Sequence, residues 1–117
     1  MSCTVEIRQA GDIAVVDLSG RITLGEGSGT VRSTIKDLLA KGKKDILLNL
    51  GEVSYIDSAG LGELVGAYAS VSSQGGHIKL LNVQKRVQDL LQVTKLYSIF
   101  EFFTDERAAL ASFAPSA

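Results

Sequence analysis

The feature that most constrains the fold is a short, almost continuously apolar run in the middle of the chain, Ile46-Leu47-Leu48-Asn49-Leu50. A strand with one face in water alternates apolar and polar residues, whereas this run is typical of a strand buried on both faces. Such a strand lies near the centre of a sheet that other elements cover on both sides. The sequence therefore favours an α/β domain in which helices pack against a central sheet.

Other strands are predicted on both sides of this run. An alternating stretch, 5–8, and a mostly apolar stretch, 13–18, flank a Gly-Asp turn at 11–12 and predict an N-terminal hairpin. Two later stretches, 78–81 and 99–103, are rich in aliphatic or aromatic residues and predict the remaining strands.

Four helices are predicted from apolar residues that recur at helical spacing. They run from Val31 to a stop at Gly42, from Leu61 to Gly75, from a cap at Asn82 through Leu91, and from a cap at Thr104 through Phe113. The predicted connections include a polar, glycine-rich segment at 21–29 and a loop at 51–57. This order predicts a mixed, mostly parallel sheet with an antiparallel N-terminal hairpin and about four helices.

Length and composition limit the domain organisation and the chemistry. With 117 residues and 45% hydrophobic content, residues 1–117 are expected to form a single domain, with 114–117 as a frayed tail. A net charge of −1 leaves no basic excess for direct nucleic-acid binding. The lone Cys3, the absence of a signal-peptide pattern and the lack of a long apolar run favour a cytoplasmic protein without membrane insertion. With one His and one Cys, neither a metal site nor a catalytic triad is expected.

One segment asks for more than a structural explanation: Tyr55-Ile56-Asp57-Ser58-Ala59-Gly60-Leu61-Gly62-Glu63. It joins the central strand to a predicted helix, and either Asp57 or Ser58 can be the N-cap. Gly60 and Gly62 each cost about 0.5 to 1 kcal/mol relative to Ala inside a helix. Two explanations stay open: close packing of this turn on a neighbouring element, or a helix end left bare for an approaching macromolecule.

Ser58 is a candidate modification site, because its small neighbours leave the hydroxyl open to a kinase. A phosphate at a helix N-terminus gains about 0.3 to 1 kcal/mol from the helix dipole, so it need not unfold the domain. Inside an interface, the same charge is opposed by repulsion and desolvation, and about 1.4 kcal/mol changes an affinity tenfold. The sequence therefore predicts that Ser58 can act as a binding switch.

A glycine-rich phosphate cradle is the rival interpretation of Gly60-Leu61-Gly62 and of Gly25-Glu26-Gly27-Ser28-Gly29. Neither stretch has the full dinucleotide-binding or P-loop pattern, and neither supplies the phosphate-binding lysine. Glu26 would also repel a phosphate. The second stretch is therefore better interpreted as a flexible loop before the first helix.

The stretch from Asp57 to Gly62, following the apolar strand, resembles the signature of STAS domains of the anti-sigma factor antagonist type. The similarity covers nearly the whole chain and includes the first hairpin through Gly20, the helix end at Gly42, the turn at Gly75 and the segment 90–96. The resemblance implies a STAS fold and a protein-interaction module that needs no cofactor and is not an enzyme.

The resemblance also implies a partner and a site. Ser58 would be phosphorylated by an anti-sigma factor that is also a serine kinase, and the unphosphorylated domain would sequester this kinase and free a sigma factor. A metal-dependent serine phosphatase would reset the switch. The partner surface is expected to include Asp57, Gly60, Leu61, Gly62, Arg21 and Thr23. Many relatives carry an acidic residue where this chain has Thr23, so the connector after Gly20 is expected to bear on the choice of partner.

Two other functions stay open at this point. The same fold could serve as an accessory or scaffold subunit of a transport or signalling complex, although the intact pair of Asp57 and Ser58 favours the switch. A small enzyme or nucleotide-binding domain is the third possibility. For that function the sequence supplies neither a phosphate-binding lysine nor an acid–base cluster.

Overall fold

The computed structural model describes residues 3–25 and 27–113, so the tail expected at 114–117 lies outside the described residues. The elements follow one another as β1 (Thr4–Ala10), β2 (Ile13–Ile22), α1 (Ser28–Ala40), β3 (Asp45–Ile56), α2 (Ser58–Ser73), β4 (His77–Leu81), α3 (Lys85–Val93), the 3₁₀ helix η1 (Leu96–Ile99), β5 (Phe102–Phe103) and α4 (Glu106–Ala111).

The strands form one mixed sheet in the spatial order β1-β2-β3-β4-β5. β1 and β2 pair antiparallel around Gly11, whose φ of +62° is a left-handed conformation that glycine adopts without strain. All other neighbouring strands pair in parallel. The predicted fold class is confirmed: a mostly parallel sheet with an antiparallel N-terminal hairpin and, in the described part of the chain, four α-helices.

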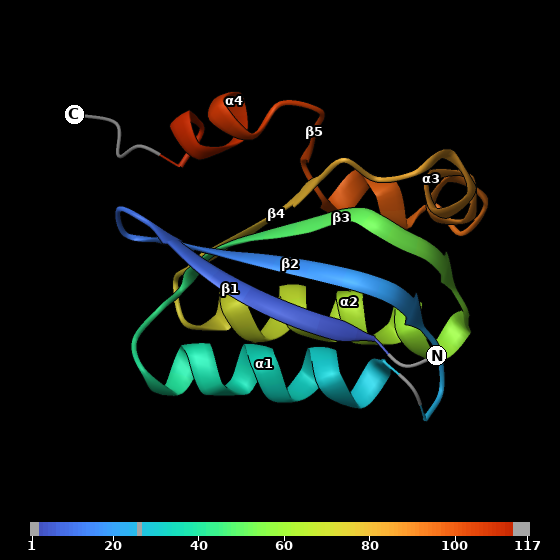
Figure 1. Cartoon of the computed structure of the whole chain (residues 1–117), viewed down its shortest axis with the longest axis horizontal. Coiled ribbons are helices and arrows are strands. Elements are labelled where there is room, and N and C mark those ends of the chain that lie inside the picture. Colours follow the sequence, from blue (N-terminus) through green and yellow to red (C-terminus); the bar gives the residue numbers. More distant parts are fainter. Residues whose placement is uncertain (1–2, 26, 114–117) are drawn as a thin grey trace.

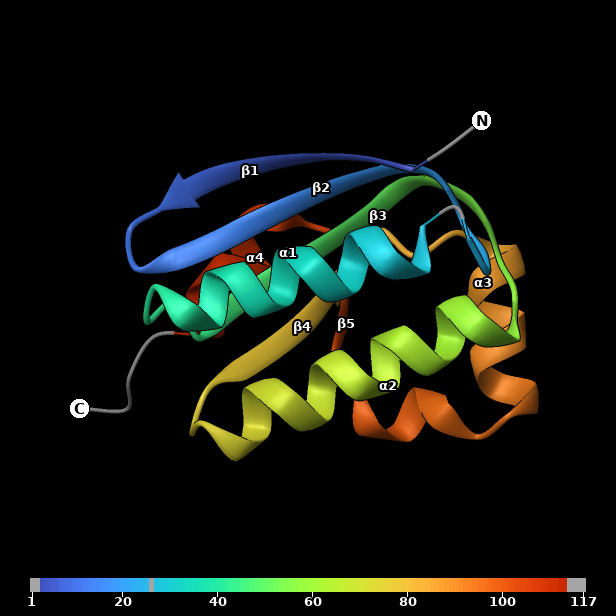
Figure 2. The same cartoon turned by 90° about the horizontal axis from the view of Figure 1, so that it is seen from below.

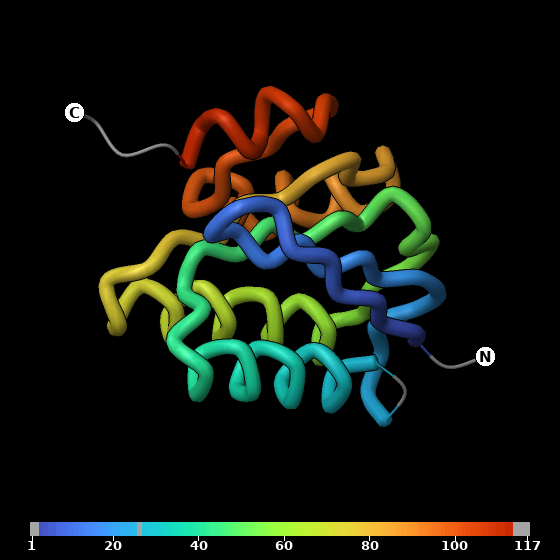
Figure 3. Tube along the Cα trace, turned by 60° about the vertical axis from the view of Figure 1, so that its left-hand side comes forward, coloured from blue at the N-terminus to red at the C-terminus, as the bar shows by residue number. Residues whose placement is uncertain are grey.

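Helices cover the two faces of this sheet unequally (Figure 1). α1 and α2 lie side by side against one face, as the view from below shows (Figure 2). α4 lies on the opposite face, so that the C-terminal segment and α1 enclose the sheet between them (Figure 3). The larger core cluster fills the α1–α2 side, and a smaller cluster under α4 consists of Val15, Leu47, Leu81 and Ala109.

β3 contains the central apolar run and is buried on both faces, as predicted. Ile46 and Leu48 belong to the larger core cluster, whereas Leu47 between them belongs to the cluster under α4. Each of the three side chains is at most 1% exposed. The absence of alternation in this run therefore reflects helices on both sides of one strand.

β2 and β3 run further than their sequence patterns predict. β2 continues to Ile22 and β3 to Ile56, and the two ends pair in parallel up to these last residues. The loop predicted at 51–57 is therefore wrong, and the connector predicted at 21–29 shrinks to the residues between Ile22 and the start of α1. Parallel pairing supplies backbone hydrogen bonds that a local pattern of polar and glycine residues does not reveal.

Two helix caps near the C-terminus are corrected by the structure. Asn82 does not cap the third helix, because its φ of +57° bends the chain after β4 and Gln84 is the N-cap of α3. Thr104 does not cap the last helix either. The Asp105 carboxylate accepts a hydrogen bond from the backbone N–H of Ala108 at 3.1 Å and takes that role.

The strand predicted at 99–103 is also corrected. Its first residues belong to η1 and to the bend after it, and only the two residues of β5 pair with β4. The Phe100 side chain enters the larger core cluster, and its ring meets the Tyr68 ring edge-on at a centroid distance of 5.7 Å. Phe100, the first aromatic residue of this run, thus fills the core beside α2, and the strand begins two residues later.

Candidate functional site

The segment singled out in the sequence lies where β2 and β3 end and α2 begins (Figure 2). In open α/β sheets, binding sites gather at the carboxyl ends of parallel strands. Asp57 is the N-cap of α2, because its Oδ1 accepts a hydrogen bond from the backbone N–H of Gly60 at 2.9 Å. Of the two candidates for the N-cap, Asp57 takes the role, and Ser58 is the first residue of the helix.

The Asp57 carboxylate also joins the β2–α1 connector to this helix end. Its Oδ2 accepts a hydrogen bond from the backbone N–H of Leu24 at 3.1 Å, and the Asp57 N–H donates to the carbonyl of Ile22 at 3.3 Å. The hydrogen bonds from Gly60 and Leu24 hold the pKa of the Asp57 carboxyl below its usual value. An ionised Asp57 therefore links the connector and the start of α2 at neutral pH.

Glycine is present at positions 60 and 62 for different structural reasons. A Cβ on Gly60 would lie 2.1 Å from the carbonyl oxygen of Ile22, so only glycine allows α2 to approach the end of β2 this closely. A Cβ on Gly62 would have nothing within 4 Å, and this residue is exposed. The two explanations left open by the sequence divide accordingly: Gly60 serves close packing, and Gly62 leaves the helix surface bare.

Ser58 is exposed on the first turn of α2. Its hydroxyl lies at the positive end of a 16-residue helix, where an added negative charge is favourable. The one histidine of the chain, His77, begins β4 beyond the other end of α2, so no imidazole is available to activate Ser58 as a nucleophile.

The two predicted connector residues, Arg21 and Thr23, differ in exposure. Arg21 is exposed, and its guanidinium lies 5.2 Å from the centroid of the Tyr55 ring on β3. Such a distance is that of a cation–π contact. Thr23 is only 9% exposed, and its carbonyl accepts hydrogen bonds from the backbone N–H groups of Gly27 and Ser28 at 3.1 and 3.2 Å. Thr23 thus shapes the connector from within, while Arg21 is presented to solvent.

The structure brings the predicted site residues together at one end of the sheet but does not expose all of them. Exposed or half-exposed members are Arg21, Asp57, Ser58 and Gly62, and buried members are Thr23, Gly60 and Leu61. Sequence reasoning missed Leu24, which is 78% exposed and is held by the Asp57 carboxylate. The signal that could have found it is a large apolar residue beside Gly25 in a polar, glycine-rich connector.

A pocket of about 410 Å³ lies between the start of α2 and α3, and we call it the α2–α3 pocket. It is lined by Tyr55, Ile56, Asp57, Ser58, Leu61, Arg86, Val87, Leu90 and Thr94. Its lining residues come from the end of β3, the start of α2, and α3 with the residue that follows it. Ser58 therefore stands at the edge of a hollow whose walls are mostly apolar.

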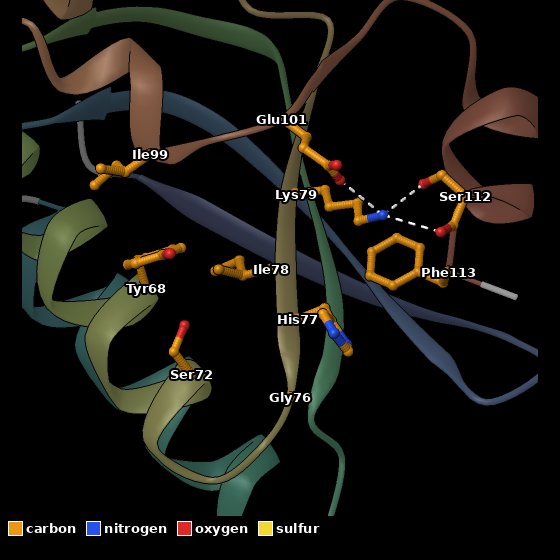
Figure 4. A pocket seen from close by; sticks show the side chains of 10 residues that line it. All are labelled: Tyr68, Ser72, Gly76, His77, Ile78, Lys79, Ile99, Glu101, Ser112 and Phe113. Atoms are coloured by element: carbon orange, nitrogen blue, oxygen red, sulfur yellow. Dashed lines mark hydrogen bonds and ion pairs between the residues drawn. The ribbon is translucent and has the colours of Figure 1, made fainter. Parts of the chain in front are cut away.

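A second pocket, of about 490 Å³, lies between the C-terminal half of α2, β4 and the end of α4 (Figure 4). Its lysine, Lys79, is only 8% exposed and is fully engaged. The Nζ donates to the carbonyl and hydroxyl oxygens of Ser112 at 3.0 and 2.9 Å and pairs with Glu101 at 2.8 Å. These bonds fasten α4 to the sheet. They give each of the three N–H groups of the Lys79 ammonium an acceptor.

Two findings concern the described residues, 3–25 and 27–113, as a whole. No group of three or more His, Cys, Asp or Glu side chains there could hold a metal ion. None of the helices in that part of the chain has both the length and the apolar character needed to cross a membrane.

Residues 4–109 match the sequence model of the STAS domain. The anti-sigma-B factor antagonist of Bacillus subtilis (strain 168) is 33% identical over 101 residues, which cover 86% of this chain and 91% of that protein. The anti-sigma F factor antagonist of Paenibacillus polymyxa is 27% identical over 111 residues, which cover 94% of each chain. The chain belongs to the STAS domain family, as a member of the anti-sigma factor antagonist type.

Solved structures show the same fold at low sequence identity. An anti-sigma factor antagonist from Mycobacterium paratuberculosis has a TM-score of 0.84 and 20% identity, with 96% of this chain and 94% of that chain covered. The Bacillus cell fate determinant SpoIIAA in its phosphorylated form has a TM-score of 0.72 and 21% identity, with 93% and 99% covered. A sulfate transporter family protein from Wolinella succinogenes has a TM-score of 0.77 and 19% identity, with 88% and 85% covered.

Proposed function

We propose that this chain is a phosphorylation-controlled antagonist of an anti-sigma factor. In its unphosphorylated form it binds an anti-sigma factor that is also a serine kinase, and this binding releases a sigma factor. The names of the relatives, antagonists of anti-sigma-B and anti-sigma F factors, support the class of partner. The observation that carries the proposal is the exposed Ser58 at the start of α2, beside the exposed Leu24 and the bare surface at Gly62.

The proposed contact surface has an exposed layer and a supporting layer. Arg21, Asp57, Ser58 and Gly62 meet the partner, joined by Leu24, because these residues are accessible. Thr23, Gly60 and Leu61 lie beneath them and hold the connector and the helix end in place. An exposed leucine beside small residues offers apolar area that a partner can bury.

The phosphorylation step needs ATP bound to the partner kinase. The Ser58 Oγ attacks the γ-phosphorus, the new O–P bond forms as the bond to the β,γ-bridging oxygen breaks, and ADP leaves with that electron pair. The hydroxyl proton passes to a base of the kinase. The product carries about −1.5 to −2 charges at pH 7 next to a surface that must be desolvated, so the complex dissociates. A metal-dependent serine phosphatase then resets Ser58 by hydrolysis, and the chain itself acts in the cytoplasm without catalysis or cofactor.

The first experiment asks whether Ser58 accepts phosphate. The protein is incubated with ATP and the candidate serine kinases of its host, and the phosphate is mapped by mass spectrometry. We expect the label on Ser58, with none on a Ser58→Ala variant. Ser70, which is exposed on the same helix, is the internal control. Absence of label on Ser58 with every candidate kinase would disprove the switch.

The second experiment asks whether charge at this position controls binding. Ser58→Asp is expected to weaken binding to the anti-sigma factor at least tenfold in calorimetry, while its circular dichroism spectrum stays that of the wild type. Ser70→Asp adds the same charge further along α2 and is expected to bind like the wild type. Equal affinities of the two variants would contradict the proposal that charge at Ser58 acts inside the interface.

A second candidate function is an accessory or scaffold subunit of a transport or signalling complex. The observation in its favour is the fold shared with the sulfate transporter family protein from Wolinella succinogenes. A shared fold alone does not carry a function with it. The kinase assay separates the two candidates, because an accessory subunit does not require phosphate on Ser58. ATP hydrolysis by the purified chain would instead support the third possibility, an enzyme.

A further inference from the structure

The α2–α3 pocket places a cation beside Ser58. The nine residues that line it include one basic residue, Arg86, and one acidic residue, Asp57. Arg86 comes from the first turn of α3, whereas Ser58 comes from the first turn of α2, so the two residues approach the pocket from different elements.

Arg86 is exposed and has no charged partner in the part of the chain that the structure describes. No carboxylate there lies within 4.0 Å of its guanidinium. Its neighbour Lys85 pairs with Asp89 at 3.3 Å, so the other cation of this helix turn is already compensated. The arrangement leaves Arg86 as a free guanidinium on the rim of the pocket.

The position of Arg86 in its own helix is electrostatically unfavourable. α3 has no acidic residue in its first turn, and the N-cap Gln84 makes no side-chain cap hydrogen bond. A cation at a helix N-terminus is opposed by the helix dipole, which prefers a negative charge there. A negative group arriving at this rim would therefore relieve an existing repulsion as well as make a new attraction.

We propose that Arg86 is the internal counter-ion of phosphorylated Ser58. The proposal rests on the proposed function, because it needs a phosphoryl group on Ser58. Three phosphate oxygens then extend from the start of α2 over the pocket, and the long Arg86 side chain donates to them from the start of α3. The planar guanidinium fork suits two parallel hydrogen bonds to phosphate oxygens, which a lysine cannot make.

Other charges around Ser58 do not take this role. The Asp57 carboxylate repels a phosphate, and both its oxygens already accept backbone hydrogen bonds from Gly60 and Leu24. The Arg21 guanidinium is stacked on the Tyr55 ring, and it does not line the pocket. Arg86 is the cation that shares a pocket with Ser58, and Arg21 provides a nearby control.

The counter-ion gives the switch a second component. Without phosphate, Arg86 and the apolar pocket wall are open to the partner. With phosphate, the ion pair joins α2 to α3 across the pocket and withdraws both the cation and the hollow from the surface. Phosphorylation would then remove a binding feature in addition to adding repulsion.

The experiment uses the full chain with phosphoserine incorporated at position 58 during synthesis, so that no kinase is needed. The second pKa of the phosphate, about 6 in an unperturbed phosphoserine, is measured by ³¹P NMR titration. The wild type, Arg86→Gln and the control Arg21→Gln are compared. Because a nearby cation favours the dianion, we expect the pKa in Arg86→Gln to be about half a unit to one unit higher than in the wild type. Arg21→Gln is expected to titrate like the wild type.

Thermal unfolding provides a second readout of the same bridge. Phosphorylation is expected to raise the melting temperature of the wild type more than that of Arg86→Gln, and Arg86→Lys should recover only part of the difference. Identical phosphate pKa values in the wild type and Arg86→Gln, or an upward shift in Arg21→Gln alone, would overturn the assignment. If no kinase labels Ser58 but the pKa difference is found, the proposed function fails and the Arg86 assignment stands.

Discussion

Because Gly60 has no Cβ, α2 can approach the end of β2 closely at this residue. A Cβ there would lie 2.1 Å from a backbone carbonyl oxygen, that of Ile22, which cannot move aside as a flexible side chain would. We expect Gly60→Ala to lower the free energy of unfolding by about 1 to 3 kcal/mol, as overpacking does. Denaturant unfolding measures this loss.

Gly62 provides the matched control on the same helix. A Cβ there meets nothing within 4 Å. Gly62→Ala is therefore expected to raise the free energy of unfolding by up to about 0.5 to 1 kcal/mol through the better helix propensity of alanine. If Gly60→Ala and Gly62→Ala changed stability alike, the close approach at Ile22 would not be the reason for Gly60.

Leu24 is the residue on which the proposed interface depends most for apolar contact. It is 78% exposed, so its substitution should leave the fold unchanged. We expect Leu24→Ser to weaken binding to the anti-sigma factor by about fivefold or more, the loss of about 1 kcal/mol that an interface contact of this kind produces. Val93→Ser, at the last residue of α3 and 80% exposed, is the control and should bind normally. Unchanged affinity of Leu24→Ser in calorimetry would remove Leu24 from the interface.

Among the elements, α4 is held to the sheet in part by one buried lysine. The helix has six residues, of which only Ala109 is buried, and the Lys79 Nζ donates to the carbonyl of Ser112 just after its last turn. A cation at that end is also favoured by the helix dipole. Hydrogen bonds to a charged group contribute about 1.5 to 3 kcal/mol.

We therefore expect Lys79→Ala to release α4 locally. Amide hydrogen exchange in residues 106–113 should accelerate by about tenfold or more, because the opening of this helix then costs less free energy. Lys85→Ala removes an exposed lysine from α3 and should leave exchange in α4 unchanged. Equal exchange rates of α4 in the wild type and Lys79→Ala would show that the Lys79 hydrogen bonds do not hold this helix.

The sequence predicted the order of these elements better than their extents. Apolar periodicity identifies β3 and α2 because burial on one or both faces imposes a local pattern. The end of β3 is not visible in that pattern, since its pairing with β2 is a contact between distant segments. The strand predicted at 99–103 was too long for the same reason, because only Phe102–Phe103 pair with β4 and the place of Phe100 in the core depends on α2.

The candidate site was likewise predictable only where its residues are neighbours in the sequence. Asp57, Ser58, Gly60 and Gly62 follow one another in the chain, so their capping and helix-breaking chemistry can be recognised locally. The distinct reasons for the two glycines and the position of Leu24 required the end of β2 to be placed beside α2. Arg86 is 28 residues away from Ser58 in the sequence, and only the fold brings the two to one pocket.

At the scale of the whole molecule, one ion-pair network connects the two ends of the chain. The Arg8 Nε lies 2.6 Å from Asp17 Oδ2, and another guanidinium nitrogen lies 2.8 Å from Glu106 Oε1. The network thus joins the N-terminal hairpin to α4. The Arg8 guanidinium lowers the pKa of both carboxyls, chiefly through its hydrogen bonds to them.

These shifts predict how stability depends on pH. Because both carboxyls have a lower pKa in the folded chain than the usual values of about 3.9 and 4.3, the unfolded chain takes up protons first as the pH falls. Their stabilisation is therefore complete above about pH 5 and is lost as the pH falls through the folded pKa values.

Arg8→Gln tests this network through acid unfolding. The variant should be less stable than the wild type at pH 7 by about 0.2 to 1 kcal/mol for each of these exposed pairs. The difference in the free energy of unfolding should shrink as the pH falls below about 5 and through the folded pKa values of the two carboxyls. Arg107→Gln, at an exposed residue of α4, should follow the wild-type curve. Parallel curves for the wild type and Arg8→Gln would show that the network does not contribute to acid sensitivity. In Arg8→Gln, the free energy of unfolding should still depend on pH, in part through Asp57. The pKa of Asp57 is lowered by backbone hydrogen bonds that this substitution leaves in place.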